Sequence, residues 1–281
     1  MKTPISYYGG KQRLVPEILP LIPDHDIYAE VCVGGGAVYF AKPPSRHESI
    51  NDLDGRVVNF YRVAKTRFPE LQALVHATLH SEAEYFRAKA ILPLEDSDPL
   101  ERAWAFWVQT NMSFGHIIGG GFRHSNTFNT GKADEPRKST LKRETFTDAY
   151  ARRLELCEVF CRDAVDVIKL KDSPRTFFYI DPPYWESDCG HYGGYTREDY
   201  QRLLQACAAM QGKFLLSSYP CPELLAMREA LSWHTKDIEG TVAVSGKRKE
   251  RKGKTECLTY NYSLAAEPIG LFGAEHLTNH A

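Results

Sequence analysis

The chain has 281 residues, a length that suits one large domain with a smaller appendage, because single cores stop growing near ~250–300 residues. Hydrophobic residues make up 43% of the sequence and charged residues 25%, which excludes an intrinsically disordered protein. The formal net charge of −1 argues against a protein that coats nucleic acid nonspecifically.

Targeting signals and cysteine frameworks are also absent from the sequence pattern. The amino-terminal residues lack the apolar core of a signal peptide, and no run of about eighteen apolar residues occurs anywhere. We therefore expect a cytoplasmic protein. The 7 cysteines form no C-x-x-C pair, so we expect reduced thiols and neither a disulfide framework nor a zinc site.

A first strand, glycine turn and helix are predicted from residue 27 onward. An apolar run from Ile27 to Val33 ends in Gly34-Gly35-Gly36, and the apolar residues 37–41 follow directly. This order is typical of the opening of a βαβ unit, where a cofactor approaches the backbone at a helix N-terminus. Any glycine turn between a strand and a helix looks the same, so the turn alone indicates a cofactor weakly. Upstream, Tyr8-Gly9-Gly10-Lys11 either bends over a cofactor or is a mobile terminal segment.

An acidic segment is expected after the second strand. That strand should end near Ile50, before Asn51-Asp52-Leu53-Asp54 and an amphipathic helix. Asp52 lies at the distance along the chain where a carboxylate binds ribose hydroxyls in nucleoside-binding folds. Alternatively Asp52 caps the helix, a role that Asp54 could equally perform. Because the glycine spacing does not match G-x-G-x-x-G, a nicotinamide cofactor is disfavoured.

Residues 67–150 interrupt the alternation of strands and helices and predict an inserted, mainly helical lobe. Trp104 and Trp107 lie at positions i and i+3 of its central helix, a spacing typical of buried core. A glycine-rich and basic stretch follows. Side chains that contact DNA bases include apolar wedges and base-edge donors, and the candidates here are Phe114, Arg123, His124 and Asn126.

Alternation resumes after the lobe. Asp163 follows the strand-like residues 159–161 and either accepts a hydrogen bond from a cofactor adenine or lies in a solvated turn. Thr176 to Ile180 predicts a strand that stops at Asp181-Pro182-Pro183-Tyr184.

The Asp-Pro-Pro-Tyr segment makes the sharpest chemical prediction. An adenine amino nitrogen is a poor nucleophile because its lone pair is delocalised into the ring. The Asp181 carboxylate and a rigid backbone carbonyl beside the prolines would accept its hydrogens and favour attack on a methyl group. Tyr184 would stack on the base, an interaction worth ~1–3 kcal/mol. The alternative is a strand end with a Pro-Pro turn and a surface aspartate.

The carboxy-terminal part offers a helix near residues 196–210, a strand from Lys213 to Ser217, and a predicted hairpin. The hairpin is suggested by two β-prone runs, 241–244 and 257–262, that flank the basic segment 247–254. A solvated loop is the usual interpretation of such a charge run, and phosphate contact by Lys247, Arg248 and Lys249 is the alternative.

In this order the segments resemble the Dam-like adenine-N6-specific DNA methyltransferases, which use S-adenosylmethionine. The resemblance covers most of the chain: YYGGKQRL, AEVCVGGGAVYF and INDLDGRVVNFYRVAK resemble the cofactor motifs, CRDA a segment beside the cofactor adenine, IDPPYW the catalytic motif, and KTECLTYNY the last strands. It implies an α/β, Rossmann-like methyltransferase fold with a mostly parallel seven-stranded sheet. Residues 1–66 and 151–281 would form the catalytic domain and residues 67–150 the target-recognition domain.

The resemblance also implies roles for single residues. The cofactor-binding residues would be Tyr8, Lys11, Glu30, Gly34, Gly36, Asp52 and Asp163. The catalytic residues would be Asp181, Pro182, Pro183 and Tyr184.

Two departures from the family pattern affect these expectations. Val31-Cys32 stands where the family usually has Pro-Phe, so we expect an aromatic contact to the cofactor to be missing and the affinity for the cofactor to be weak. Phe114-Gly115-His116 replaces an aromatic residue followed by Asn-Gly, which leaves the DNA recognition sequence undetermined.

The expected reaction is methyl transfer from S-adenosylmethionine to the amino group of an adenine flipped out of double-stranded DNA. We expect a monomer that needs no metal and no membrane, with a restriction endonuclease of the same system as a candidate partner. The alternatives are a cytosine-N4 DNA methyltransferase, an enzyme that methylates a protein glutamine or an RNA base through a similar Pro-Pro-Tyr motif, and a DNA-binding homologue with impaired catalysis.

Overall fold

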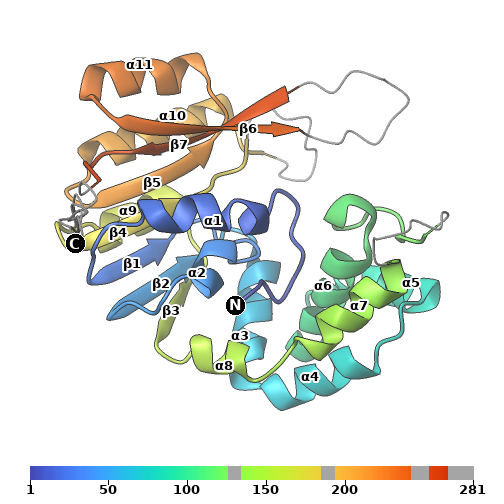
Figure 1. Ribbon diagram of the computed structural model, residues 1–281. Coiled ribbons are helices and arrows are strands. Elements are labelled where there is room, and N and C mark those ends of the chain that lie inside the picture. The colour runs from blue at the N-terminus through green and yellow to red at the C-terminus, as the bar shows by residue number, and fades with distance from the viewer. Residues whose placement is uncertain (126–133, 185–193, 242–252, 265–281) are drawn as a thin grey trace, which may run out of the picture.

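The computed structural model describes residues 1–125, 134–184, 194–241 and 253–264. A seven-stranded sheet in the order β3-β2-β1-β4-β5-β7-β6 runs through the molecule (Figure 1). The strands are β1 Ile27–Glu30, β2 His47–Asn51, β3 Cys157–Phe160, β4 Thr176–Ile180, β5 Lys213–Ser218, β6 His234–Thr241 and β7 Gly253–Tyr260. Strands β1 to β5 pair in parallel, while β7 is antiparallel to both β5 and β6. The predicted α/β fold with a mostly parallel sheet is confirmed.

Helices cover both faces of this sheet because its central strands are buried on both sides. Successive residues of β4 enter two different core clusters: Phe177 and Tyr179 join one, and Phe178 and Ile180 join the other. The first cluster lies under α1 Val15–Ile18, α2 Ala37–Ala41 and α3 Gly55–Thr66, and the second under α9 Ala164–Lys171, α10 Arg197–Ala209 and α11 Pro222–Leu231. Such two-sided burial is typical of a parallel strand and explains the continuous apolar run in the sequence.

After α3, the described part of the chain before β3 is mainly helical, and it forms the group of helices seen beside the sheet in Figure 1. Its helices are α4 Phe68–Ala77, α5 Glu82–Ile91, α6 Pro99–Met112 and α7 Glu135–Glu144, followed by α8 Ala149–Arg153. Trp104 and Trp107 of α6 are 1% and 0% exposed, so the prediction that they are core residues is confirmed. The helices share one core cluster with α3, and the predicted boundaries at residues 67 and 150 stay a prediction.

Short 3-10 helices complete the described elements: η1 Lys11–Arg13, η2 Leu19–Leu21 and η3 Phe114–His116. Within the described residues, no helix is long and apolar enough to cross a membrane.

The predicted carboxy-terminal hairpin is present, with one strand displaced from its predicted position. β6 pairs with β7 from His234 opposite Tyr260 to Thr241 opposite Gly253. The prediction placed the first strand at residues 241–244, of which 242–244 lie outside the described residues. β6 was missed because it is an edge strand whose polar sequence, HTKDIEGT, lacks an apolar run.

Candidate active site

The carboxyl ends of β1 and β4 meet at the centre of the sheet. The two strands are parallel neighbours, with Glu30 opposite Tyr179. From β1 the chain proceeds outward on one side to β2 and β3, and from β4 on the other side to β5. Ligands of open α/β sheets bind at such a change of direction, outside the carboxyl ends of the strands. The glycine turn follows β1 and the Asp-Pro-Pro-Tyr segment follows β4, so the topology brings these two predicted motifs together.

The glycine turn requires glycine at two positions. Gly34 and Gly36 have φ angles of 45° and 68°, and Gly36 is the left-handed N-cap of α2. A Cβ atom on Gly34 would lie 2.9 Å from the Cδ1 atom of the Tyr7 ring. The aromatic ring that packs on the turn therefore belongs to Tyr7, one residue before the predicted Tyr8. Tyr7 and Tyr8 are adjacent and have the same side chain, so the sequence alone does not predict which ring packs on the turn.

Asp52 holds the glycine turn, and its neighbour performs the capping. Asp52 Oδ2 accepts a hydrogen bond from the Gly34 N–H at 2.8 Å, and its Oδ1 accepts from the Asp54 N–H at 2.9 Å. Asp54 is the N-cap of α3 and accepts from the Arg56 N–H. Burial raises the pKa of Asp52 to about 6, although the two backbone N–H groups oppose this shift. Each carboxylate oxygen retains a lone pair for a ligand hydroxyl.

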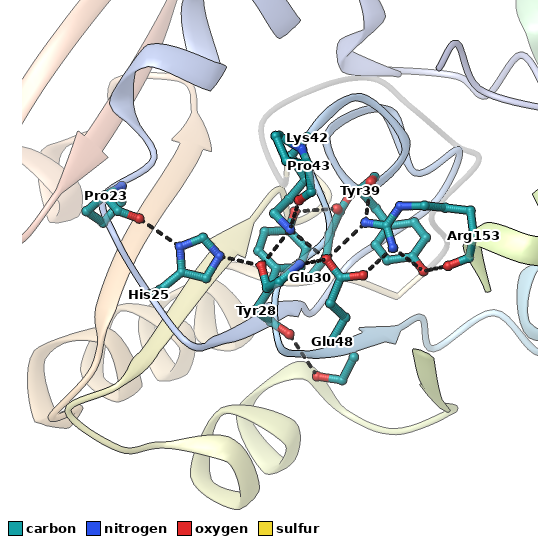
Figure 2. A network of polar contacts seen from close by, with 11 residues as sticks. Pro23, His25, Tyr28, Glu30, Tyr39, Lys42, Pro43, Glu48 and Arg153 are labelled. Atoms are coloured by element: carbon teal, nitrogen blue, oxygen red, sulfur yellow. Dashed lines mark hydrogen bonds and ion pairs between the residues drawn. The ribbon is translucent and has the colours of Figure 1, made fainter. Parts of the chain in front are cut away.

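Glu30 lies deeper than the other candidate cofactor residues. Figure 2 shows it beside Tyr28 in a network of polar contacts, and the Tyr28 hydroxyl donates to Glu30 Oε2 at 2.6 Å. The side chain is 2% exposed, and burial raises its pKa to about 8. Glu30 is therefore a buried, protonated acid near neutral pH. The negative charge of Asp181 also raises the pKa of Glu30.

Asp163 caps a helix at the end of β3. Its Oδ1 accepts from the Val165 N–H at 2.8 Å as the N-cap of α9, and its Oδ2 pairs with the Arg202 guanidinium at 2.7 Å. Asn51 was not predicted as a site residue, yet it joins neighbouring strand ends: its amide donates to the carbonyls of Val31 and Arg162. Its place directly after Ile50, where the strand was predicted to end, was the signal that could have identified Asn51.

Lys11 and Asp181 form a buried ion pair at the end of β4. Lys11 Nζ lies 2.7 Å from Asp181 Oδ1, and the two side chains are 7% and 19% exposed. Burial raises the pKa of Asp181 to about 6, and the Lys11 ammonium limits this rise. Burial alone would lower the pKa of Lys11, but the charges of Asp181 and Glu256 raise it above its ordinary value. Lys11, predicted at the cofactor, is thus joined to the predicted catalytic aspartate.

Glu256 of β7 is a further site residue that sequence reasoning missed. Its Oε1 accepts a hydrogen bond from the Ser217 hydroxyl at 2.6 Å and another from the Tyr184 hydroxyl, and it lies 3.5 Å from Lys11 Nζ. The predicted strand began one residue later, at Cys257. An acid next to an otherwise apolar strand was the available signal.

The aromatic side of the site is formed by Tyr184 and Tyr219. Their ring centroids are 4.3 Å apart in a tilted arrangement, and Lys11 Nζ lies 4.9 Å from the Tyr184 centroid. Pro182 is buried and Pro183 is half-buried, so the rigid turn is anchored against the fold. Burial raises the pKa of the Tyr184 phenol well above its ordinary value, so the hydroxyl remains a donor.

Val31-Cys32, which stands where the resembled family has Pro-Phe, is apolar and closely packed. Val31 is 1% exposed in the core cluster that α10 covers, and Cys32 is half-buried beside it. Burial, together with the charges of Asp52 and Asp181, raises the pKa of the Cys32 thiol well above its ordinary value. A protonated thiol therefore lies near both carboxylates.

The candidate base contacts of the helical lobe differ in exposure. Phe114 is 56% exposed, and His124 is exposed at the end of the same described segment. Arg123 is instead tied into the protein: it donates to the Asn111 carbonyl at 2.9 Å and pairs with Glu135 at 2.5 Å. Asn126, Lys247, Arg248 and Lys249 lie outside the described residues.

Comparisons with known proteins agree with this geometry. The model of the family described as D12 class N6 adenine-specific DNA methyltransferase matches residues 7–238. A Type II methyltransferase of Lactococcus lactis subsp. cremoris is 25% identical over 279 residues, which cover 92% of this chain and 94% of that protein. The DNA N-6-adenine-methyltransferase of Escherichia phage P1 is 26% identical over 184 residues, 64% of this chain and 23% of the phage protein. The DNA adenine methylase of Vibrio cholerae is 26% identical over 192 residues, 64% of each chain.

Proposed function

Because this chain belongs to the D12 class N6 adenine-specific DNA methyltransferase family, we propose that its methyl transfer takes place at Asp181, Pro182, Pro183 and Tyr184 with S-adenosylmethionine as the methyl donor. The family assignment confirms the resemblance predicted from the motifs and identifies the chain as an adenine-specific DNA methyltransferase. It supports adenine N6 rather than the cytosine-N4 alternative. The remaining questions are which residues act and how.

One observation carries the proposed site: the glycine turn and the Asp181 carboxylate adjoin at the change of strand direction. The pairing of Glu30 with Tyr179 sets the two strand ends side by side. A cofactor held by the turn and a base held by Asp181 would therefore meet.

The residues at this edge fit a positively charged nucleoside. Asp52, Asp163 and Asp181 bring carboxylates to the ends of β2, β3 and β4, and Asp52 is already fixed by the turn. We assign cofactor binding to these strand ends: Asp52 would accept from ribose hydroxyls, Asp163 from the adenine amino group, and Gly34 and Gly36 would allow close approach. Tyr8, Lys11 and Glu30 complete the proposed set. When bound, S-adenosylmethionine supplies a methyl group on a positively charged sulfur.

Asp181 is proposed to accept from the target amino group. Both contacts of its carboxylate to the described residues involve Oδ1, so Oδ2 remains available for a substrate donor. A second acceptor, the backbone carbonyl held by Pro182 and Pro183, would complete the geometry that favours attack. Lys11 keeps Asp181 ionised, which makes it an acceptor above a pH of about 6.

The base must leave the duplex to reach this edge, so we propose base flipping. Tyr184 would stack on the flipped adenine, and the exposed Phe114 would fill or wedge the vacated space. The helical lobe is proposed as the target-recognition domain, with Arg123, His124 and Asn126 as candidate base contacts. Double-stranded DNA is the proposed partner of a cytoplasmic monomer, and a restriction endonuclease of the same system is a further candidate.

The test compares Asp181→Ala with Asp96→Ala, a change of an exposed aspartate in the helical lobe. Purified variants are incubated with labelled S-adenosylmethionine and plasmid DNA from a methylation-free host, and the nucleosides are separated by mass. We expect Asp181→Ala to lose transfer by at least about a hundredfold while calorimetry gives a near-normal cofactor affinity. Asp96→Ala should behave as wild type.

The cytosine-N4 alternative and the catalytically impaired alternative each have their own outcome in the same experiment. Comparable labelling of adenine by Asp181→Ala would contradict the proposed site, and label on cytosine would identify an N4 enzyme. A wild-type protein that binds no cofactor would support the catalytically impaired alternative suggested by Val31-Cys32.

A further inference from the structure

Glu256 contacts two groups that belong to the proposed site, the Lys11 ammonium and the Tyr184 hydroxyl. β7 is inserted between β5 and β6, and this brings Glu256 next to the carboxyl end of β5. There its Oε1 accepts from Ser217 and Tyr184 and lies near Lys11 Nζ. The Glu256 side chain is 14% exposed. These contacts offset part of the cost of removing the Glu256 carboxylate from water.

Glu256 shares both donors of Asp181. Lys11 Nζ lies 2.7 Å from Asp181 and 3.5 Å from Glu256, and the Tyr184 hydroxyl lies 3.3 Å from Asp181 Oδ1 while also donating to Glu256. Without Glu256 these donors would both turn to Asp181. The Asp181 carboxylate would then be neutralised and partly saturated, and it would be a weaker acceptor for an amino group.

We propose that Glu256 is a positioning residue for methyl transfer: it shares Lys11 and the Tyr184 hydroxyl with Asp181, and so keeps the Asp181 carboxylate available to the target amino group. This inference deepens the proposed function and rests on the assignment of Asp181 as the acceptor. Ser217 fixes the Glu256 carboxylate from the β5 side, at a hydroxyl distance of 2.6 Å. The hydrogen bond from the Tyr184 hydroxyl to Glu256 in turn holds the Tyr184 ring, which would stack on the base.

The charge of Glu256 has a measurable consequence for pH dependence. Charged and titratable groups from several elements face Asp181. Lys11 comes from η1, Glu30 from β1 and Cys32 from the turn after it. Tyr179 comes from β4, Tyr184 from the segment that follows β4, and Glu256 from β7. Burial is the largest cause of the raised pKa of Asp181, and the negative charge of Glu256 raises it further. Removing that charge should lower the pKa of Asp181, so activity should persist to more acidic pH.

The test uses the full chain with three variants. Glu256→Gln keeps the shape and removes the charge, Glu256→Asp keeps the charge on a shorter side chain, and Ser217→Ala removes one hydrogen-bond partner but no charge. Steady-state kcat and KM are measured from acidic to alkaline pH with plasmid DNA from a methylation-free host, and the cofactor Kd by calorimetry.

We expect Glu256→Gln to lower kcat by about tenfold or more with a nearly unchanged cofactor Kd. In the plot of kcat against pH, the acid limb of this variant should move to lower pH by about half a unit or more. Glu256→Asp and Ser217→Ala should keep the acid limb of the wild type. If Glu256→Gln does not fold, Glu256→Asp must still show a reduced kcat with an unshifted limb for the inference to stand.

Two results would overturn the inference. One is a Glu256→Gln variant with the kcat and acid limb of the wild type. The other is an equal loss of kcat in Glu256→Gln and Ser217→Ala without any displacement of the limb, which would indicate a structural contact alone. Activity of Asp181→Ala in the same assay would instead refute the proposed acceptor, so the two failures are distinguishable.

Discussion

Glu30 is a carboxylic acid in the protein interior, and its protonation links the site to folding. Burial, opposed by the hydrogen bond from Tyr28, raises its pKa from an ordinary value of 4.5 to about 8. The folded state therefore binds the proton more tightly than the unfolded state. The stability that this provides is fully present below a pH of about 4.5 and is lost as the pH rises through about 8.

Glu30→Gln tests this linkage, because glutamine keeps the shape and is always neutral. At pH near 8.5 we expect the variant to have a free energy of unfolding roughly 4–5 kcal/mol above that of the wild type, and near pH 5 one that differs by less than about 1 kcal/mol. Urea unfolding at the two pH values measures the difference, with the exposed Glu95→Gln as the control. A difference that does not depend on pH would show that Glu30 is ionised in the fold.

The sequence predicts site residues that belong to a local motif. It does not predict contacts between residues that are distant in the chain and come together only in the fold. Asp181 and Asp52 directly follow strand ends, so their position at the carboxyl edge could be inferred. The sequence places Lys11 at the cofactor but does not predict its ion pair with Asp181. That ion pair depends on how the amino-terminal segment crosses the sheet. Glu256 is seventy-five residues from Asp181 in the chain, and the antiparallel insertion of β7 brings the two together.

Among the elements, α8 returns the chain from the helical lobe to the sheet, and Arg153 anchors it. The Arg153 guanidinium donates to Glu48 Oε1 of β2 at 2.9 Å and to the Tyr39 carbonyl of α2 at 3.0 Å (Figure 2). It also lies over the Tyr39 ring, 3.9 Å from the centroid. Glu48 is 6% exposed and also pairs with Lys42, so its charge depends on both cations.

Arg153→Ala should destabilise the protein because it leaves the buried Glu48 with one cation. We expect a loss of about 2–4 kcal/mol in the free energy of unfolding. The neighbouring Arg152 pairs with Asp148 at the surface, where both side chains are more than half exposed. Arg152→Ala is thus a matched control that should change stability by less than about 1 kcal/mol. Equal losses in the two variants, measured by chemical unfolding, would assign no anchoring role to Arg153.

The elements that the sequence predicts well are those buried on both sides. The predicted strand Thr176 to Ile180 has the observed bounds, since every residue of β4 is buried and the prolines that follow stop it. Edge strand β6 carries no such pattern, because Ile238 is the only large apolar residue in a strand that has one neighbour. Burial on both faces, rather than strand propensity, made the difference.

For the whole molecule, the change of strand direction between β1 and β4 determines where the reaction can occur. The helical lobe and the β6–β7 hairpin extend beside this edge from opposite halves of the chain (Figure 1). A duplex that presents a base to Asp181 would therefore be flanked by both. Because DNA is a polyanion and the net charge of the chain is −1, attraction must come from local positive charge.

The basic segment between β6 and β7 is the largest local excess of positive charge in the sequence, and Lys247, Arg248 and Lys249 lie in it. If these residues contact phosphates, changing all three to alanine should reduce the slope of log affinity against log salt by up to about 3 and leave sequence preference unaltered, since phosphates carry no sequence information. Binding is measured at several salt concentrations on two unrelated duplexes. Lys65→Ala, which removes a cation from α3, serves as the control for lost charge elsewhere. An unchanged slope in the triple variant would assign the segment to solvent, and a selective loss on one duplex would assign it to base recognition.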